Sequence, residues 1–202
     1  MTAPTVFVVD DNPTVRKSMQ ALFQAADLAV ETYASAADFL AAYDARRPGC
    51  LVLDIRLKRE SGLDLQDELR KRNAILPIIV MTGYADVPTS VRAFKAGAID
   101  FLRKPVPPKK LIALIHEAIE TDRRARETLE QRTTVTDRIA ELTPRERQVM
   151  DLLAVGKSSR DIATALDLSV RTVEGHRRNI LRKMEVDSAV QLARAIAMAR
   201  RS

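Results

Sequence analysis

Apolar runs of four to six residues recur through the first half of the chain, and each is bounded by turn or polar residues. Runs of this length that are rich in Val, Ile, Leu and Phe are typical of buried strands. The five runs are Val6–Val9, Leu28–Tyr33, Cys50–Asp54, Pro77–Thr82 and Ile99–Arg103. Helix-length segments separate them, and this alternation predicts a parallel sheet covered on both faces. We therefore expect an α/β doubly wound, flavodoxin-like (βα)5 domain over residues 1–120.

Polar side chains that can bind ligands or react lie where these apolar runs end. Asp10 and Asp11 follow the first run, Asp54 ends the third, Thr82 ends the fourth and Lys104 follows the fifth. The carboxyl ends of parallel strands share one edge of a sheet, and ligands bind there. We therefore expect all five side chains to meet at that edge.

Clustered carboxylates repel one another at neutral pH and need a cation. Oxygen ligands without His or Cys suit Mg²⁺, and an amine at Lys104 with a hydroxyl at Thr82 completes the groups that phosphoryl transfer requires. Asp54 stands alone on the central strand, so we predict that it is the nucleophile that becomes an aspartyl-phosphate. The Asp10–Asp11 pair suits metal binding.

The second half of the chain has only helical periodicity. Thr143-Pro-Arg-Glu146 is a capping box with proline at the first helical position. The predicted helices run from Thr143 to Gly156, from Ser159, from Ser169 to about Met184 and from about Ser188 to Arg200. The two central helices are joined by the tight turn Asp167–Ser169, which fits helix-turn-helix geometry. We expect an all-α four-helix domain over residues 138–202.

A long helix over residues 109 to about 132 is predicted between the two domains. Beyond Ile119 it is almost wholly charged, which is typical of a solvent-bridging connector or of one partner in a two-helix contact. Thr133–Asp137 then has poor helix formers and is the candidate for a flexible joint. We take residues 121–137 as a helical linker.

Charge is spread unevenly over the chain. Residues 1–120 contain 16 Lys/Arg and 15 Asp/Glu, a net charge of +1, whereas residues 121–202 contain 17 and 12, a net charge of +5. The helix after the tight turn carries five basic residues against one acid, Glu174. This imbalance suggests that the second half binds a polyanion.

Composition excludes several other classes. The single cysteine excludes internal disulfides, and one cysteine with two histidines argues against a structural zinc site. The apolar runs are far shorter than the ~20 residues of a membrane span, and no basic region precedes the first run as in a secretory signal. We expect a cytoplasmic protein with no membrane partner.

Residues 1–120 resemble the receiver domain of bacterial two-component response regulators, through Asp10-Asp11, Asp54, Thr82-Gly83 and Lys104-Pro105. The resemblance implies that a sensor histidine kinase phosphorylates Asp54. It implies Mg²⁺ held by Asp10, Asp11, Asp54 and the main-chain carbonyl of Arg56. It also implies switch roles for Thr82 and Phe101, pairing of Lys104 with the phosphoryl group, and a cis Lys104–Pro105 bond. One departure is the charged loop Leu57–Gly62, where the family usually has a Pro-Gly pair.

Residues 138–202 resemble the LuxR-type helix-turn-helix domain, through Leu142–Arg147, Ile162-Ala163, Leu168-Ser169 and Arg171–Arg177. By this resemblance Glu174, Gly175 and Arg178 face base edges. Lys157, Arg171, Thr172, His176 and Lys183 face phosphates or the groove wall. The two domains together resemble the FixJ/NarL class, which implies a phosphorylated homodimer that binds double-stranded promoter DNA, with RNA polymerase as a further partner.

Two other readings remain open. A dehalogenase-like phosphohydrolase has a second acid two residues after its nucleophile, where this chain has Arg56. A constitutive DNA binder with a vestigial receiver is the other. We expect a regulator and not an enzyme, with slow autodephosphorylation at Asp54 as its only reaction of this kind. Arg56 and Tyr84 flank the site, where they can tune the rate of that reaction. Whether the long helix pairs in a dimer is also open.

Overall fold

The computed structural model describes residues 3–58, 61–83 and 87–200, and it divides into two compact units. The first unit is Met1–Arg126 and the second unit is Glu127–Ser202. Arg59 and Glu60 of the charged loop, and Tyr84, lie outside the described residues. Over the described ranges, no helix is both long and apolar enough to cross a membrane.

The first unit is built on a five-stranded sheet in which every pairing is parallel and the strand order is β2-β1-β3-β4-β5. The strands are β1 (Thr5–Val9), β2 (Ala29–Tyr33), β3 (Gly49–Asp54), β4 (Ile78–Thr82) and β5 (Ala98–Arg103). This confirms the predicted doubly wound sheet. The chain reverses its direction of winding between β1 and β3, and the crevice outside the carboxyl ends of such strands is where ligands bind.

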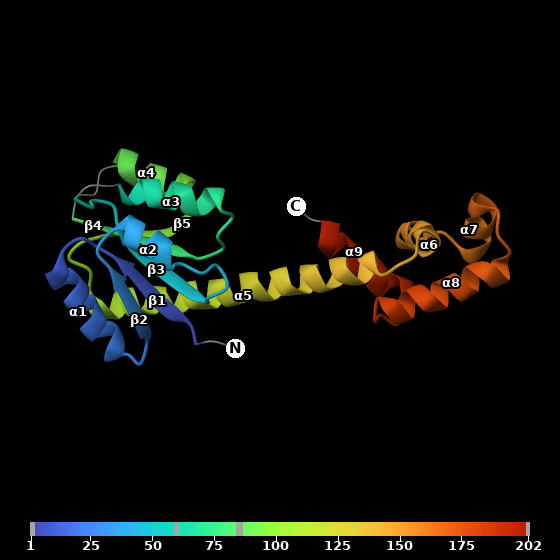
Figure 1. Ribbon diagram of the computed structural model, residues 1–202, viewed down its shortest axis with the longest axis horizontal. Coiled ribbons are helices and arrows are strands. Elements are labelled where there is room, and N and C mark those ends of the chain that lie inside the picture. The colour runs from blue at the N-terminus through green and yellow to red at the C-terminus, as the bar shows by residue number, and fades with distance from the viewer. Residues whose placement is uncertain (1–2, 59–60, 84–86, 201–202) are drawn as a thin grey trace. The chain divides into compact units, whose positions relative to one another are not determined.

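Helices cover both faces of this sheet (Figure 1). They are α1 (Pro13–Gln24), α2 (Ala36–Ala42), α3 (Gly62–Lys71), α4 (Val87–Lys95) and α5 (Pro108–Ala140). Phe23 of α1 and Leu111 and Ile115 of α5 pack on one face of the sheet. Phe39 of α2 and Leu69 of α3 belong to the core on the other face. The central strands β1, β3 and β4 are buried on both faces, and their sequences are therefore continuous apolar runs.

The sequence predicts a helix that Ser35 caps and that continues to about Ala45, but α2 ends at Ala42. Tyr43 is extended, and the Asp44 carboxylate accepts hydrogen bonds from the backbone and side chain of Arg46. This local turn replaces the last helical turn.

Helix α5 is longer than the sequence predicts. It was expected to end at about residue 132, but it continues to Ala140, so Thr133–Asp137 is helical and the predicted joint is wrong as a break in the helix. The hydroxyls of Thr133, Thr134 and Thr136 each donate to the carbonyl four residues earlier, at 2.9–3.0 Å. Val135 is buried in the core of the second unit, and this packing outweighs the low helix propensity of the threonines.

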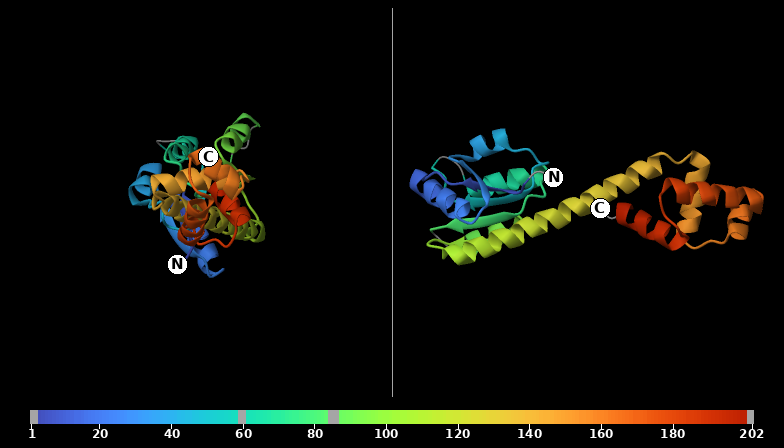
Figure 2. Two further views of the ribbon diagram at one scale, coloured as in Figure 1. Left: turned by 90° about the vertical axis from the view of Figure 1, so that its right-hand side faces the viewer. Right: turned by 90° about the horizontal axis from the view of Figure 1, so that it is seen from below.

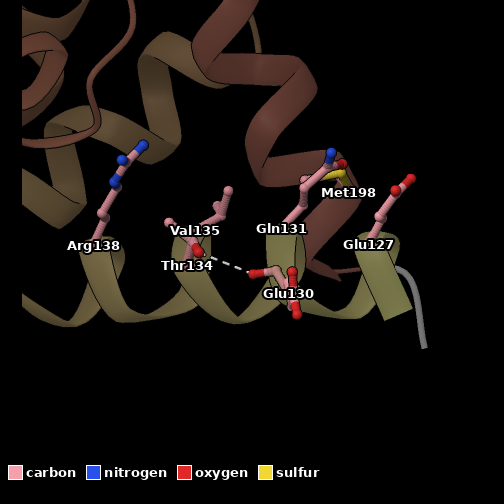
Figure 3. A pocket seen from close by; sticks show the side chains of 7 residues that line it. All are labelled: Glu127, Glu130, Gln131, Thr134, Val135, Arg138 and Met198. Carbon is pink, nitrogen blue, oxygen red and sulfur yellow. Dashed lines mark hydrogen bonds between the residues drawn. The ribbon is translucent and has the colours of Figure 1, made fainter. Parts of the chain in front are cut away.

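Figure 3 shows the side of α5 on which Gln131 and Val135 lie, together with Met198 of the last helix. These residues line an open groove of about 370 Å³ in the second unit. The bond from the Thr134 hydroxyl to the Glu130 carbonyl is visible there on the same helix. Charged, polar and apolar side chains line the groove together, and its lining residues do not point reactive groups at a common position. We therefore do not treat it as a candidate site.

Two charged residues that the sequence places in the linker pack into the first unit, where Asp122 is buried and Arg126 is half-buried. The Asp122 carboxylate, 1% exposed, accepts hydrogen bonds from Gly49 N at 2.9 Å and Arg126 Nε at 2.7 Å. Arg126 also donates to the carbonyls of Ala45 and Arg47 at 2.9 and 2.8 Å. We call Asp122 and Arg126 the α5 latch. It ties α5 to the segment before β3, so the first unit extends past residue 120.

The second unit contains the end of α5 and four further helices. These are α6 (Pro144–Ala154), α7 (Ser159–Leu166), α8 (Val170–Lys183) and α9 (Ala189–Arg200). The capping box predicted at Thr143 is confirmed, and Ser158 and Asp161 form a second one at the start of α7. One core joins all four helices, with fully buried Val149, Ile162, Val173, Ile180 and Leu192. The all-α domain is therefore confirmed.

The turn between α7 and α8 is formed by three residues. Asp167 ends α7 in the left-handed conformation, with φ 52°, and Leu168 N donates back to the Ala163 carbonyl at 2.9 Å. The Ser169 side chain then caps α8 by accepting from Thr172 N at 3.0 Å. Such a turn between two short helices is the core of a helix-turn-helix. Figure 2 shows both helices from two further directions.

Candidate functional site

The strand ends of the first unit bring two carboxylates to one amine. Lys104 Nζ lies 2.6 Å from Asp10 Oδ2 and 2.6 Å from Asp54 Oδ2. The second oxygen of each carboxylate accepts a backbone N–H, from Asn12 at 2.9 Å and from Arg56 at 3.0 Å. The Asp10 and Asp54 side chains are only 5% and 12% exposed. We call these three side chains the acid–amine cluster.

The electrostatics of the cluster keep Lys104 charged. Burial alone would lower the pKa of Lys104, but hydrogen bonds from its amine to Asp10 and Asp54 outweigh burial and raise that pKa. The amine is thus a fixed positive charge beside two carboxylates at neutral pH. Such a charge can pair with an anion that arrives at Asp54.

Thr82 and Pro105 also lie at this edge. Thr82 is buried at the end of β4, and its carbonyl accepts a hydrogen bond from Lys104 N at 2.8 Å. The Lys104–Pro105 peptide bond is cis, as the receiver resemblance implies. Phe101 of β5 is half-buried against the core beneath α2, α3 and α4. Four of the predicted strand-end residues, Asp10, Asp54, Thr82 and Lys104, are therefore positioned by neighbouring strand ends.

The donor set at this edge is one of hard oxygens, which is the set that Mg²⁺ prefers. Asp10 and Asp54 already converge on a cation, the Lys104 amine. Within the described ranges, no three His, Cys, Asp or Glu side chains stand together as a metal site. Asp11 is partly exposed and takes no part in the ion pairs of Lys104. The oxygen ligands at this edge therefore suit a hard divalent ion. Two of the carboxylates, Asp10 and Asp54, already lie together.

Gly62 shapes the backbone behind Asp54, a role that the sequence does not reveal. A Cβ at Gly62 would lie 2.2 Å from the Asp54 carbonyl oxygen, and Gly62 N donates to the Ile55 carbonyl at 2.8 Å. An antiparallel bridge between Arg56 and Ser61 closes the same loop. The loop that departs from the family pattern is therefore anchored at both ends, next to the carboxylate that it follows.

The second candidate site is the exposed side of α8. Arg171 and Arg178 of α8 are exposed, as is Lys157 before α7, and none of the three side chains forms a hydrogen bond or ion pair with another described residue. Val173 and Ile180 point the other way, into the core. Unpaired cations opposite an apolar stripe are what phosphate binding requires.

The remaining predicted residues of α8 vary in environment. Thr172 is exposed, and its hydroxyl lies 2.7 Å from the Ser169 hydroxyl at the start of α8. Gly175 and His176 are half-buried, and a Cβ added at Gly175 would meet no atom within 4 Å. Glu174 is exposed, and its carboxylate accepts a hydrogen bond from the Ser159 hydroxyl of α7.

Lys183 stands apart from the other predicted DNA contacts. Its amine lies 2.8 Å from Glu146 Oε2 and 3.3 Å from the Glu141 carbonyl, so its charge is used inside the second unit. Burial would raise the pKa of Glu146, but hydrogen bonds from Lys183 and from Thr143 outweigh it and lower that pKa. Lys183 therefore has a partner on α6 inside the second unit, and its phosphate contact stays a prediction.

Comparison with known proteins identifies the chain. Residues 6–116 match the response regulator receiver domain, and residues 140–196 match the bacterial regulatory proteins of the luxR family. The transcriptional regulatory protein FixJ of Azorhizobium caulinodans is 41% identical over 194 residues, covering 96% of this chain and 92% of that protein. The chain is a response regulator of the FixJ/NarL class. This response regulator is therefore a transcriptional regulator with a receiver domain and a LuxR-type DNA-binding domain, and not a classical enzyme.

Further relatives and solved structures support the assignment of this chain to the response regulators. The transcriptional regulatory protein TdiR of Thauera aromatica is 39% identical over 190 residues, covering 94% of this chain and 84% of that protein. The structure of the response regulator StyR superposes with a TM-score of 0.87 at 37% identity, covering 97% of this chain and 99% of that one. Full-length FixJ from B. japonicum gives a TM-score of 0.60 at 36% identity, covering 98% of each chain.

Proposed function

We propose that this response regulator accepts a phosphoryl group on Asp54 from the phosphohistidine of a sensor histidine kinase, and that phosphorylation controls its binding to promoter DNA. The observation that carries the proposal is the acid–amine cluster, in which Lys104 bridges Asp10 and Asp54 at 2.6 Å each. A nucleophilic carboxylate, a fixed cation and a neighbouring hydroxyl are the groups that phosphoryl transfer uses.

In the proposed transfer, a carboxylate oxygen of Asp54 forms a bond to phosphorus while the bond from phosphorus to the imidazole nitrogen breaks. Lys104 pairs with the developing negative charge, and Thr82 donates a hydrogen bond to a phosphoryl oxygen. Asp10, Asp11, Asp54 and the Arg56 carbonyl are the groups that would hold Mg²⁺, which supplies further charge neutralisation when it is bound. Slow autodephosphorylation at Asp54 belongs to the same proposal.

Phosphorylation would be transmitted through Thr82 and Phe101 to the face formed by α4 and β5. Val91 and Phe94 of α4 and Ile99 of β5 are exposed there, at 45%, 50% and 40%. Large apolar side chains gathered on an exposed face favour a protein partner. We propose that this face forms the homodimer of the phosphorylated protein.

The second unit would then bind a pair of half-sites about one helical turn of DNA apart. Support comes from the exposed, unpaired side chains of Lys157, Arg171 and Arg178. Glu174, Gly175 and Arg178 are proposed to face the bases. The proposed contacts to phosphates or the groove wall come from Lys157, Arg171, Thr172, His176 and Lys183. RNA polymerase is the proposed partner of the DNA-bound dimer.

The phosphoacceptor is tested by incubating the full-length protein with acetyl phosphate and Mg²⁺ and measuring its intact mass. We expect the mass of one phosphoryl group to be added to the wild type and to Asp100→Asn, a control acid on β5, but not to Asp54→Asn. Omission of Mg²⁺ should reduce the modified fraction. Equal modification of Asp54→Asn and wild type would overturn the assignment.

A further inference from the structure

We infer that Ser159 is a positioning residue for DNA sequence recognition, because its hydroxyl holds the Glu174 carboxylate in place on the exposed side of α8. The inference rests on the proposed DNA binding and deepens it. Ser159 is the first residue of α7, and its hydroxyl donates to Glu174 Oε1 across the two helices of the helix-turn-helix. No feature of the sequence singles out this contact.

The Ser159 hydroxyl is not needed to cap its own helix. Ser158 is the N-cap of α7, and its side chain accepts from Asp161 N at 3.2 Å while Asp161 bonds back to Ser158 N at 3.1 Å. The capping box is therefore complete without Ser159. The contact between Ser159 and Glu174 is an additional link, directed from the start of α7 to an exposed residue of α8.

A hydroxyl, and not a guanidinium, holds the Glu174 carboxylate. Arg171 and Arg178 lie one turn before and one turn after Glu174 on α8, yet Glu174 forms no ion pair with either in the described part of the chain. A neutral donor fixes the carboxylate without cancelling its charge. Both arginines thus stay available for DNA, and the acid keeps its charge and one oxygen that can accept from a base.

A carboxylate held by one oxygen presents its other oxygen in a restricted direction. In the major groove, a carboxylate accepts a hydrogen bond from the N4 amino group of cytosine. Guanine O6 and N7 and thymine O4 are acceptors, so the same carboxylate repels them. We therefore assign to the Ser159–Glu174 pair a preference for cytosine at one position of each half-site, with Ser159 limiting the alternatives that Glu174 can reach.

The test uses full-length protein with acetyl phosphate and Mg²⁺, enrichment from random-sequence DNA and sequencing of the bound pool. Five proteins are compared: wild type, Ser159→Ala, Ser159→Thr, Glu174→Ala and the matched control Thr164→Ala. Thr164 also lies on α7, but its hydroxyl donates only to the Arg160 carbonyl of the same helix, at 3.1 Å. Affinity for non-specific DNA and its salt dependence are measured for each protein.

We expect Glu174→Ala to abolish the cytosine preference at one position, and Ser159→Ala to weaken the preference at that same position by roughly 3- to 10-fold, the effect of one lost hydrogen bond. Ser159→Thr should restore it, and Thr164→Ala should leave it unchanged. Non-specific affinity should be the same for wild type and Ser159→Ala, because neither phosphate contacts nor folding depend on this hydroxyl.

Two results would overturn the positioning role. One is a Ser159→Ala protein that keeps the cytosine preference of the wild type. The other is a Ser159→Ala protein that loses affinity equally for all sequences, including non-specific DNA, because this would indicate a structural role only. If the wild type enriches no sequence at all, the proposed DNA binding fails and the inference fails with it. Enrichment by the wild type without any effect of Ser159→Ala removes the inference alone.

Discussion

Lys104 and Lys183 are two partly buried lysines whose partners give them different roles. Lys104 bridges Asp10 and Asp54 from three different strand ends, whereas Lys183 joins the end of α8 to Glu146 at the start of α6. An amine between two carboxylates can exchange one of them for an arriving phosphoryl group. An amine paired with a single buried acid holds two helices together.

The pair between Glu146 and Lys183 predicts a dependence of stability on pH. The pKa of Glu146 is lowered from its ordinary 4.5, so the pair contributes stability above pH 4.5 that is lost as the pH falls through the lowered pKa. Glu146→Gln keeps the capping shape but removes the charge. We expect it to lower the free energy of unfolding by about 1.5–3 kcal/mol at pH 7.

Denaturant unfolding of the full-length protein at pH 7 and below pH 4 measures this effect. The difference between wild type and Glu146→Gln should shrink as the pH falls below 4.5 and through the lowered pKa of Glu146, because protonation removes the charge of the wild-type carboxyl. A difference that is constant with pH would contradict the role of the charge.

Gly175 gives a prediction of opposite sign. It lies inside α8, where a Cβ would meet no atom within 4 Å. Glycine inside a helix costs about 0.5–1 kcal/mol relative to alanine. Gly175→Ala should therefore raise the free energy of unfolding by that amount. Gly156 is the control, because its φ of +82° is unfavourable for alanine, so Gly156→Ala should destabilise the protein. Thermal unfolding followed by circular dichroism compares the two variants.

At the scale of elements, α5 contains two ion pairs that both join residues four positions apart but differ in burial. Asp122 and Arg126 form the buried α5 latch, while Glu120 and Arg124 form an exposed pair at 2.8 Å on the same helix. Breaking a buried pair leaves an uncompensated charge, at a cost of about 3–5 kcal/mol. Asp122→Ala should therefore destabilise the first unit by about that much.

Glu120→Ala is the matched control, and we expect a far smaller effect because its pair is exposed to solvent. Hydrogen exchange in the segment before β3 reports on the latch directly, since Gly49 N donates to Asp122. Faster exchange at Gly49 in Asp122→Ala, but not in Glu120→Ala, is the predicted result. Equal destabilisation by the two substitutions would show that burial does not distinguish these pairs.

The elements differ in how far the sequence determines them. Strand ends follow from apolar runs, because the three central strands β1, β3 and β4 are buried on both faces, and this also predicted that Asp10, Asp54, Thr82 and Lys104 lie at one edge. The length of α5 did not follow, since the charges of its middle segment give no sign that Asp122 and Arg126 pack into the first unit. Helix propensity was also misleading for Thr133–Asp137, because burial of Val135 and back-bonded hydroxyls override it.

At the scale of the whole molecule, periodicity of two kinds separates the receiver domain from the helix-turn-helix domain, and both were predicted from the sequence. Contacts between side chains on different helices of the second unit were not predicted. The link from Ser159 to Glu174 and the pairing of Lys183 with Glu146 depend on how helices pack, which one sequence does not display. The second contact gives Lys183 of the predicted DNA surface a partner within its own unit.

The central claim is that phosphorylation at Asp54 controls DNA binding. It is tested most directly by enrichment from random-sequence DNA with wild type and Asp54→Asn, each with and without acetyl phosphate and Mg²⁺. We predict that a paired half-site is enriched only by the wild type with phosphodonor, because only Asp54 can carry the phosphoryl group beside Lys104. Equal enrichment under all four conditions would contradict the account and leave a constitutive DNA binder.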